Sequence, residues 1–213
     1  MPISIMERPR IIIEMELSPD TYHFSSPRPP TLSFTLTSHA SHCLTILVPH
    51  HSPLAINRSM NMGGYPIYDL STSPPTAVKI GDMTGYISAR GAPNELVVLQ
   101  PGQQSKRFEV AFNRGASYDL SFRPQPWHIV RSGRILDQDG KETSIRRPSV
   151  VHGVDGLEAG KTYKATMAMD KLDKVPWWWG DEKDKPDPNE INSRVVGIEW
   201  YIVDGGVEFR VEE

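Results

Sequence analysis

The sequence is poor in the features that define several common protein classes. It has one cysteine among 213 residues, which excludes an internal disulfide and a zinc site built from several thiolates. No stretch approaches the roughly 20 consecutive apolar residues that a membrane-spanning helix needs. A net charge of −3 provides no basic surface for nucleic acid. We therefore expect neither a membrane nor a nucleic-acid partner.

The first residues also lack the pattern of a secretory signal, which needs an uninterrupted apolar segment of about 7–15 residues. Glu7 and Arg8 interrupt any such segment early, and Glu14 directly follows the short run Ile11–Ile13. Together with the single unpaired cysteine, this predicts an intracellular, reducing location, and we expect the protein in the cytoplasm.

Period-2 alternation between apolar and polar residues is what the sequence has in abundance. Its 19 prolines disfavour long helices and favour short elements joined by turns. The clearest alternating segments are Ile11–Leu17, Thr31–Thr37, Cys43–Val48, Tyr65–Leu70, Glu95–Leu99, Lys106–Phe112 and Tyr163–Met169. About ten such strands with frequent turns predict an all-β fold, an antiparallel immunoglobulin-like β-sandwich with long loops and little helix.

Two pairs of segments are predicted to be β-hairpins. A polar turn joins Thr31–Thr37 to Cys43–Val48. Near the C-terminus, Ile198–Ile202 and Val207–Val211 alternate on either side of Asp204–Gly206, a typical turn sequence.

We expect residues 1–213 to form a single embellished sandwich, because no linker with a shift in composition divides the chain. The only plausible break is the stretch Asn113–Ala116. Two small sandwiches in tandem remain the alternative.

Two segments share a Leu-x-x-Gly pattern before an alternating stretch, Leu99–Gly102 and Leu157–Gly160. We predict that each Leu is buried at the end of a crossing and that each Gly takes a positive φ. The second segment extends to Tyr163 and resembles the tyrosine corner of fibronectin type III and immunoglobulin-like sandwiches. This resemblance implies that the Tyr163 hydroxyl bonds back to the preceding crossing.

A broader resemblance rests on the opening strand pair, the Leu-x-x-Gly turns and the segment Val175–Gly180, Val-Pro-Trp-Trp-Trp-Gly. In these the chain is similar to functionally uncharacterised fungal proteins of comparable length. The resemblance implies a fungal source and brings no established activity. Some such small proteins are encoded beside natural-product biosynthetic genes, which favours small-molecule chemistry.

The sequence contains no segment with the residue spacing of a known cofactor-binding or nucleophile motif. The segment Gly156–Thr162 has three residues where a phosphate-binding loop needs four, and a strand pattern follows it instead of a helix. We interpret it as a turn with a solvated Lys161. The sequence also has no dinucleotide fingerprint and no nucleophile elbow. We therefore predict no cofactor.

A metal site is the next possibility, because four histidines and the cysteine lie close together in sequence. His39 and His42 precede the expected strand Cys43–Val48, and His50 and His51 follow it. A strand of this length separates the two pairs by roughly 20 Å, and either pair alone has too few ligands. We predict no metal and a small buried role for the thiol.

The tryptophans carry the most information about binding. Because side chains alternate along an extended chain, Trp177, Trp178 and Trp179 cannot all face one way. At least one indole is therefore expected at a surface or cleft, where it suits a ring, a sugar or an apolar ligand. The alternative is that two of them plug the end of the sandwich and the third covers an edge.

A second aromatic bend contains Trp127 and His128. If it meets Trp177–Trp179, the two regions form a pocket with an acid–base group, to which Tyr65 and Asp69 are further candidates. In this hypothesis His128 and Asp69 are catalytic, and the indoles and Tyr65 bind the ligand.

Two functions from different classes follow. The first is a small-molecule-binding β-sandwich for a small apolar or aromatic ligand, with a cofactor-free cyclase or isomerase of fungal natural-product biosynthesis as its enzymatic form. The second is a non-catalytic immunoglobulin-like protein-interaction module. Binding ranks ahead of catalysis, the sequence leaves open whether the chain is an enzyme, and a homodimer is compatible with both.

Overall fold

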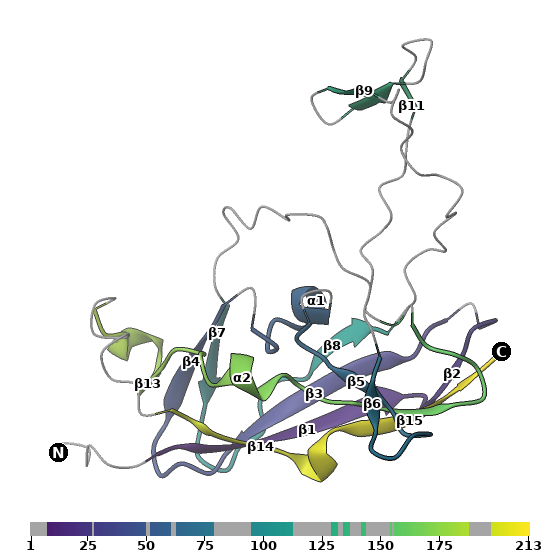
Figure 1. Cartoon of the computed structure of the whole chain (residues 1–213). Coiled ribbons are helices and arrows are strands. Elements are labelled where there is room, and N and C mark those ends of the chain that lie inside the picture. Colours follow the sequence, from purple (N-terminus) through teal and green to yellow (C-terminus); the bar gives the residue numbers. More distant parts are fainter. Residues whose placement is uncertain are drawn as a thin grey trace.

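The chain folds into β-strands with very little helix, as the computed structural model shows (Figure 1). The structure describes residues 8–26, 28–49, 52–60, 63–78, 95–112, 129–131, 134–136, 142–143, 154, 156–187 and 197–213. Within these ranges the α-helices α1 (Ile56–Ser59) and α2 (Met169–Leu172) are single turns. The fold is therefore all-β and sandwich-like, as predicted.

The first sheet has the strand order β14-β1-β3-β8. It consists of β1 (Arg10–Ser18), β3 (Thr31–Ser38), β8 (Phe108–Ala111) and β14 (Glu199–Ile202). Strand β1 runs antiparallel to β3 and parallel to β14, so strands from opposite ends of the chain lie side by side.

The second sheet has the order β2-β15-β12-β5-β6 and carries the site discussed below. It consists of β2 (Thr21–His23), β5 (Ile67–Asp69), β6 (Thr76–Ala77), β12 (Thr162–Ala165) and β15 (Val207–Glu212). Strand β2 is parallel to β15, and the other neighbours in this sheet are antiparallel.

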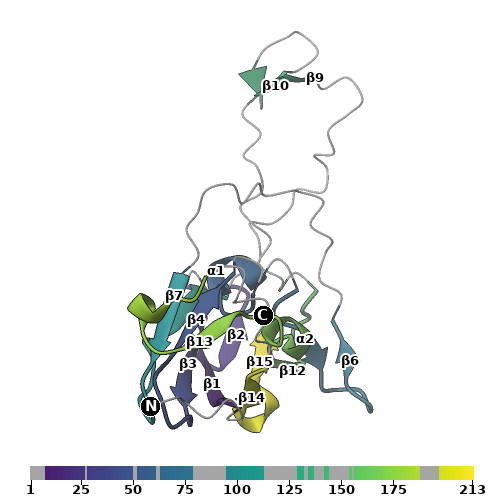
Figure 2. The same cartoon turned by 90° about the vertical axis from the view of Figure 1, so that its left-hand side faces the viewer.

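A third sheet, in the order β13-β4-β7, contains the tryptophan segment. It consists of β4 (Leu44–Val48), β7 (Glu95–Leu99) and β13 (Trp177–Trp179). A further small sheet is formed by β9 (Ile129–Arg131), β10 (Arg134–Leu136) and β11 (Glu142–Thr143). Strands β13 and β6 lie in separate parts of the molecule in both views (Figures 1 and 2).

The core follows from the alternation along the strands. On β1 the residues Ile11, Ile13 and Leu17 are buried, while Glu14 and Glu16 on the other face are exposed. On β3 the apolar residues Leu32, Phe34 and Leu36 are buried. Phe209 of β15 contacts both Phe112 and Tyr163, with ring centroids 5.2 and 5.7 Å apart. Apart from Ala168 and Trp178, the buried apolar residues of the described chain form one continuous cluster that includes all three large sheets.

Both predicted hairpins are wrong. Strands β3 and β4 belong to different sheets, and so do β14 and β15. Between β14 and β15 the chain turns through a 3₁₀ segment, Val203–Gly205, in which Asp204 has a φ of 54°. This turn carries the chain from one sheet to the other instead of folding it back within a sheet. Each pair is therefore an arch across the core.

Both Leu-x-x-Gly turns are confirmed. Leu99 and Leu157 are buried, and Gly102 and Gly160 have φ values of 69° and 82°. The strand predicted at Tyr163–Met169 is shorter than expected, because β12 ends at Ala165 and α2 begins at Met169.

The suggested break at Asn113–Ala116 lies outside the described residues, so the single-domain organisation stays a prediction. In the described part of the chain, no helix has both the length and the apolar character needed to cross a membrane. The immunoglobulin-like strand order likewise stays a prediction.

Candidate functional site: a polar cleft around Lys161

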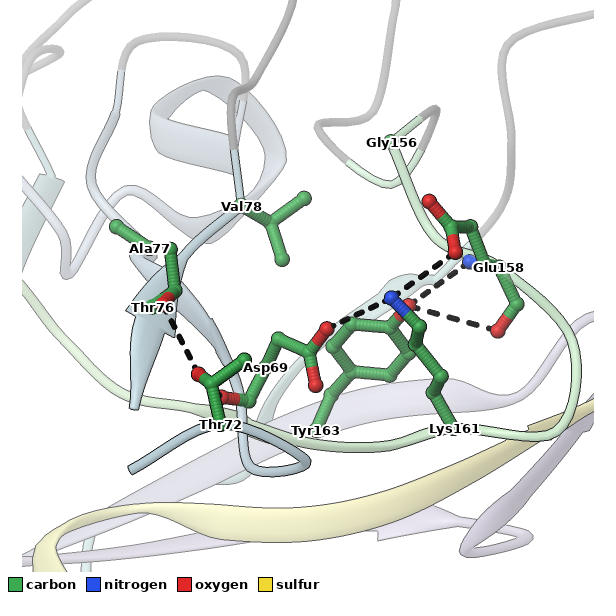
Figure 3. Close-up of a pocket in the computed structure, with 9 residues that line it drawn as sticks. All are labelled: Asp69, Thr72, Thr76, Ala77, Val78, Gly156, Glu158, Lys161 and Tyr163. Carbon is green, nitrogen blue, oxygen red and sulfur yellow. Dashed lines mark hydrogen bonds and ion pairs between the residues drawn. The ribbon is translucent and has the colours of Figure 1, made fainter. Parts of the chain in front are cut away.

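A cleft of about 210 Å³ opens between the β5–β6 hairpin and the chain segment that leads from Leu157 into β12, which we call the crossing (Figure 3). The hairpin forms one wall, and the crossing with the first part of β12 forms the other. The lining residues are Asp69, Thr72, Thr76, Ala77, Val78, Gly156, Glu158, Lys161 and Tyr163. The cleft is thus lined by charged, hydroxyl and apolar groups together.

The Lys161 ammonium lies between two carboxylates in this cleft. Its Nζ is 2.9 Å from Asp69 Oδ2 and 2.9 Å from Glu158 Oε2. The three side chains differ in exposure, at 34% for Lys161, 13% for Asp69 and 69% for Glu158. The hydrogen bonds to Glu158 and then to Asp69 raise the pKa of Lys161 above its ordinary value, so the amine stays protonated.

Asp69 is the least exposed of the three groups and is held by its own turn. The Ser71 hydroxyl and the Ser71 amide both donate to Asp69 Oδ1. The bond from the Ser71 hydroxyl, the bond from Lys161 and the bond from the Ser71 amide lower the pKa of Asp69 to about 2. Asp69 is therefore a permanent carboxylate that positions Lys161.

The other wall is fixed by the crossing Leu157–Tyr163. Gly160 has a left-handed backbone, which glycine adopts without strain, and its amide donates to the Val211 carbonyl on β15. The Tyr163 hydroxyl accepts from the Glu158 amide at 2.9 Å and lies 3.4 Å from the Glu158 carbonyl. This is the bond back to the crossing that the tyrosine-corner pattern predicts. It holds the Glu158 backbone beside Lys161.

The β5–β6 wall is closed by hydroxyl groups. Thr72 Oγ1 lies 2.9 Å from Thr76 Oγ1 and also donates to the Pro74 carbonyl at 3.0 Å. The Val78 amide donates to the Ile67 carbonyl, which keeps Ala77 and Val78 beside the cleft. Ala77 and Val78 thus add a small apolar surface opposite Lys161 and Glu158.

The arrangement favours binding through fixed charges over covalent chemistry. A lysine acts as a nucleophile only as a neutral amine, and a raised pKa opposes that form. Lys161 instead offers a permanent ammonium donor, and Glu158 offers an exposed carboxylate acceptor.

The tryptophan segment behaves differently from the cleft. Trp177 and Trp179 lie on one face of β13, opposite the buried residues Ile46 and Leu44 of β4. Both indoles are partly buried against the core, edge to face with centroids 5.2 Å apart. Trp178 points to the other face, so the alternation predicted for the three residues is confirmed.

Trp178 is 6% exposed, although it lies on the face away from the core cluster. Its Nε1 donates to the Asp181 carbonyl at 3.0 Å, because the chain folds back after β13. Gly180 permits this with a φ of 97°, and a Cβ there would lie 2.2 Å from an Asp184 carboxylate oxygen. Trp178 is thus a structural residue of this turn.

His42 packs its ring edge to face against Trp179, with centroids 6.1 Å apart. Burial and then the charges of Asp181 and Asp184 raise the pKa of the Cys43 thiol, which disfavours the reactive thiolate. Among the described residues, His, Cys, Asp and Glu form no group of three or more that could hold a metal ion. His50 and His51 lie outside that part of the chain.

Of the other predicted site residues, the structure describes Tyr65 and Asp69. Tyr65 is buried, and its hydroxyl donates to the Pro53 carbonyl at 2.7 Å. Asp69 ends β5 and lines the cleft of the second sheet. Its neighbouring strand β6 lies away from β13 in both views (Figures 1 and 2). Trp127 and His128 lie outside the described residues, so their predicted meeting with Trp177–Trp179 stays a hypothesis.

Sequence reasoning missed Lys161 and Glu158 as members of a site. Lys161 was expected to be solvated in a turn, but its ammonium is held by two carboxylates. The predicted strand after Gly160 is confirmed, which removes the helix that a phosphate-binding loop requires. The sequence did contain a signal for this pair, because an acidic residue, Glu158, and a basic residue, Lys161, stand on either side of the turn at Gly160 and can contact each other. Only the pairing of β5 with β12 adds Asp69.

No family model, curated protein or solved structure matches this chain. The resemblances to fungal proteins and to immunoglobulin-like sandwiches therefore stay predictions.

Proposed function

We propose that this protein is a small-molecule-binding β-sandwich and that the cleft around Lys161 is its binding site. The observation that carries the proposal is the Lys161 ammonium, held at 2.9 Å from two carboxylates in a cleft whose opposite wall includes Ala77 and Val78. Ligand sites combine apolar walls with a few polar groups in fixed positions. The cleft has both.

Native mass spectrometry of the full chain tests this proposal. The protein is incubated with a metabolite extract, re-isolated and weighed under native and denaturing conditions. We expect wild type to retain a metabolite-sized mass that the double variant Asp69→Asn/Lys161→Met does not retain. Lys164→Met is the matched control, because Lys164 lies on β12 with its side chain on the face opposite Tyr163.

Other outcomes would redirect the proposal. A retained mass that persists in the double variant would place the ligand elsewhere and bring the Trp177–Trp179 segment back as the candidate. A retained protein chain would favour the interaction module instead. If no mass is retained by wild type or either variant, the binding proposal loses its support.

A cofactor-free cyclase or isomerase is the enzymatic form of the same proposal. Lys161 would stabilise negative charge that develops on a substrate oxygen, since a fixed ammonium can do this without a cofactor. Its predicted proton-transfer residue, His128, lies outside the described residues. Substrate turnover by wild type and its loss in His128→Ala would test that form.

A further inference from the structure

We propose that the cleft selects a neutral molecule that presents a carbonyl or hydroxyl oxygen to the Lys161 ammonium. This inference rests on the proposed function and names the class of ligand. It is reached in three steps, from the N–H donors of Lys161 that remain unused among the described residues, the net charge of Lys161 with its two carboxylates, and the size of the cleft.

The first step is the count of hydrogen-bond donors on Lys161. A lysine ammonium has three N–H donors and no acceptor. Within the described residues, Asp69 and Glu158 each engage one of them. One donor is therefore available to an oxygen of the ligand, and a neutral oxygen can accept it.

The second step is the charge in the cleft. Two carboxylates and one ammonium leave a net charge of −1 among these three groups. An anion that approaches Lys161 also approaches Asp69 and Glu158, and a cation that approaches Glu158 also approaches Lys161. A dipole avoids both repulsions, because its oxygen faces Lys161 while a donor on the same molecule can face Glu158.

The third step is size and shape. The cleft volume of about 210 Å³ is below the roughly 300–1,000 Å³ of pockets for drug-sized ligands. Ala77 and Val78 line the wall opposite Lys161 and suit a short carbon skeleton (Figure 3). The ligand is therefore a small carbonyl or hydroxyl compound.

A matched series of probes tests the inference, because its members share one ring and differ only in the polar group. The probes are cyclohexanone, cyclohexanol, cyclohexanecarboxylate and cyclohexylammonium. Each is titrated into the ¹⁵N-labelled full chain at pH 7 while the backbone amide signals of Gly156, Glu158 and Lys161 are followed. We expect the two neutral probes to shift these signals with dissociation constants at least tenfold lower than those of the charged probes.

Variants show whether Lys161 causes the preference. In Asp69→Asn/Lys161→Met we expect the neutral probes to bind at least tenfold more weakly, while Lys164→Met keeps wild-type affinities. The double variant removes both charges together and so leaves no unpaired carboxylate at position 69. If the double variant does not fold, Lys161→Met alone replaces it as the test, because it removes the ammonium that the proposal invokes.

The outcomes separate this inference from the proposed function. Tighter binding of the carboxylate or of the ammonium probe would overturn the ligand class but leave a binding cleft. Neutral binding that is unchanged in the double variant, or in Lys161→Met if that variant replaces it, would overturn the role of Lys161. No shift with any probe would overturn both the inference and the binding site.

Discussion

The tryptophan strand β13 and the cleft around Lys161 belong to different sheets and use their side chains in opposite ways. In β13 the three indoles are buried or partly buried, and the Trp178 N–H is bonded to the Asp181 carbonyl. In the cleft, Lys161 and Glu158 keep part of their surface in solvent while their charges are fixed. The first region packs into the fold, and the second is the one that we propose as a ligand site.

This difference shows why a conspicuous run of residues in a sequence need not be the most solvent-accessible one. Three adjacent tryptophans are conspicuous in a sequence, and indoles are frequent at recognition sites. They also bury more apolar surface than any other side chain, so a fold readily uses them for packing. A Glu and a Lys three residues apart are common, and here they line a cleft together with Asp69 from a distant strand.

The largest expected effect tests the structural role of β13. Trp178→Ala should destabilise the protein by about 3–5 kcal/mol, because it removes a large buried side chain and leaves a cavity. Trp179→Ala should cost clearly less, since that indole is only partly buried. Guanidinium unfolding followed by circular dichroism measures both. Equal costs for the two variants would contradict the assignment of Trp178 as the structural residue.

The next effect concerns the tyrosine corner beside the cleft. Tyr163→Phe should cost about 1–2 kcal/mol, because the Glu158 amide loses its partner at 2.9 Å. The control is Tyr201→Phe, because Tyr201 is among the most exposed apolar side chains of the described residues and should tolerate the change. The same unfolding measurement applies. If Tyr163→Phe leaves the free energy of unfolding unchanged, the hydroxyl does not hold the crossing.

The pH dependence of stability tests the fixed charge of Asp69. Its pKa falls from 3.8 to about 2 on folding, so the contribution of Asp69 is complete above pH 3.8 and is lost as the pH falls towards 2. Asp69→Asn should therefore show a smaller loss of stability between pH 4 and 2 than wild type. Urea unfolding at several pH values in this window measures the difference. If the free energy of unfolding changes with pH equally in wild type and in Asp69→Asn, the Asp69 carboxylate is not held as the structure describes.

The smallest effect on stability is expected for Lys164→Met, the matched control for the cleft variants. Lys164→Met removes a charge whose ion pair with Glu208 is 3.6 Å long and partly exposed. Such pairs contribute about 0–1 kcal/mol, so the unfolding midpoint should change little. Its amide spectrum should also retain the signals of the cleft residues. A large loss of stability would disqualify Lys164→Met as the matched control for Lys161.

Much of the fold could be predicted from local patterns. The strands at Ile11–Leu17, Thr31–Thr37 and Glu95–Leu99 are present, because alternation directly reports which side chains face the core. The buried Leu157 and the left-handed Gly160 also follow from their local sequence. Of the predicted site residues, Asp69 lines the cleft, whereas Tyr65 is buried and bonded to Pro53.

The sequence by itself determined which segments are strands, which of their faces are apolar and where the chain turns, since these depend on neighbouring residues. The tertiary structure decided which strands pair. An alternating segment, a turn and a second alternating segment describe a hairpin and an arch equally well, and β14–β15 is an arch because its two strands join different sheets. It also decided the cleft, because Asp69 and Lys161 are 92 residues apart and meet only through the pairing of β5 with β12.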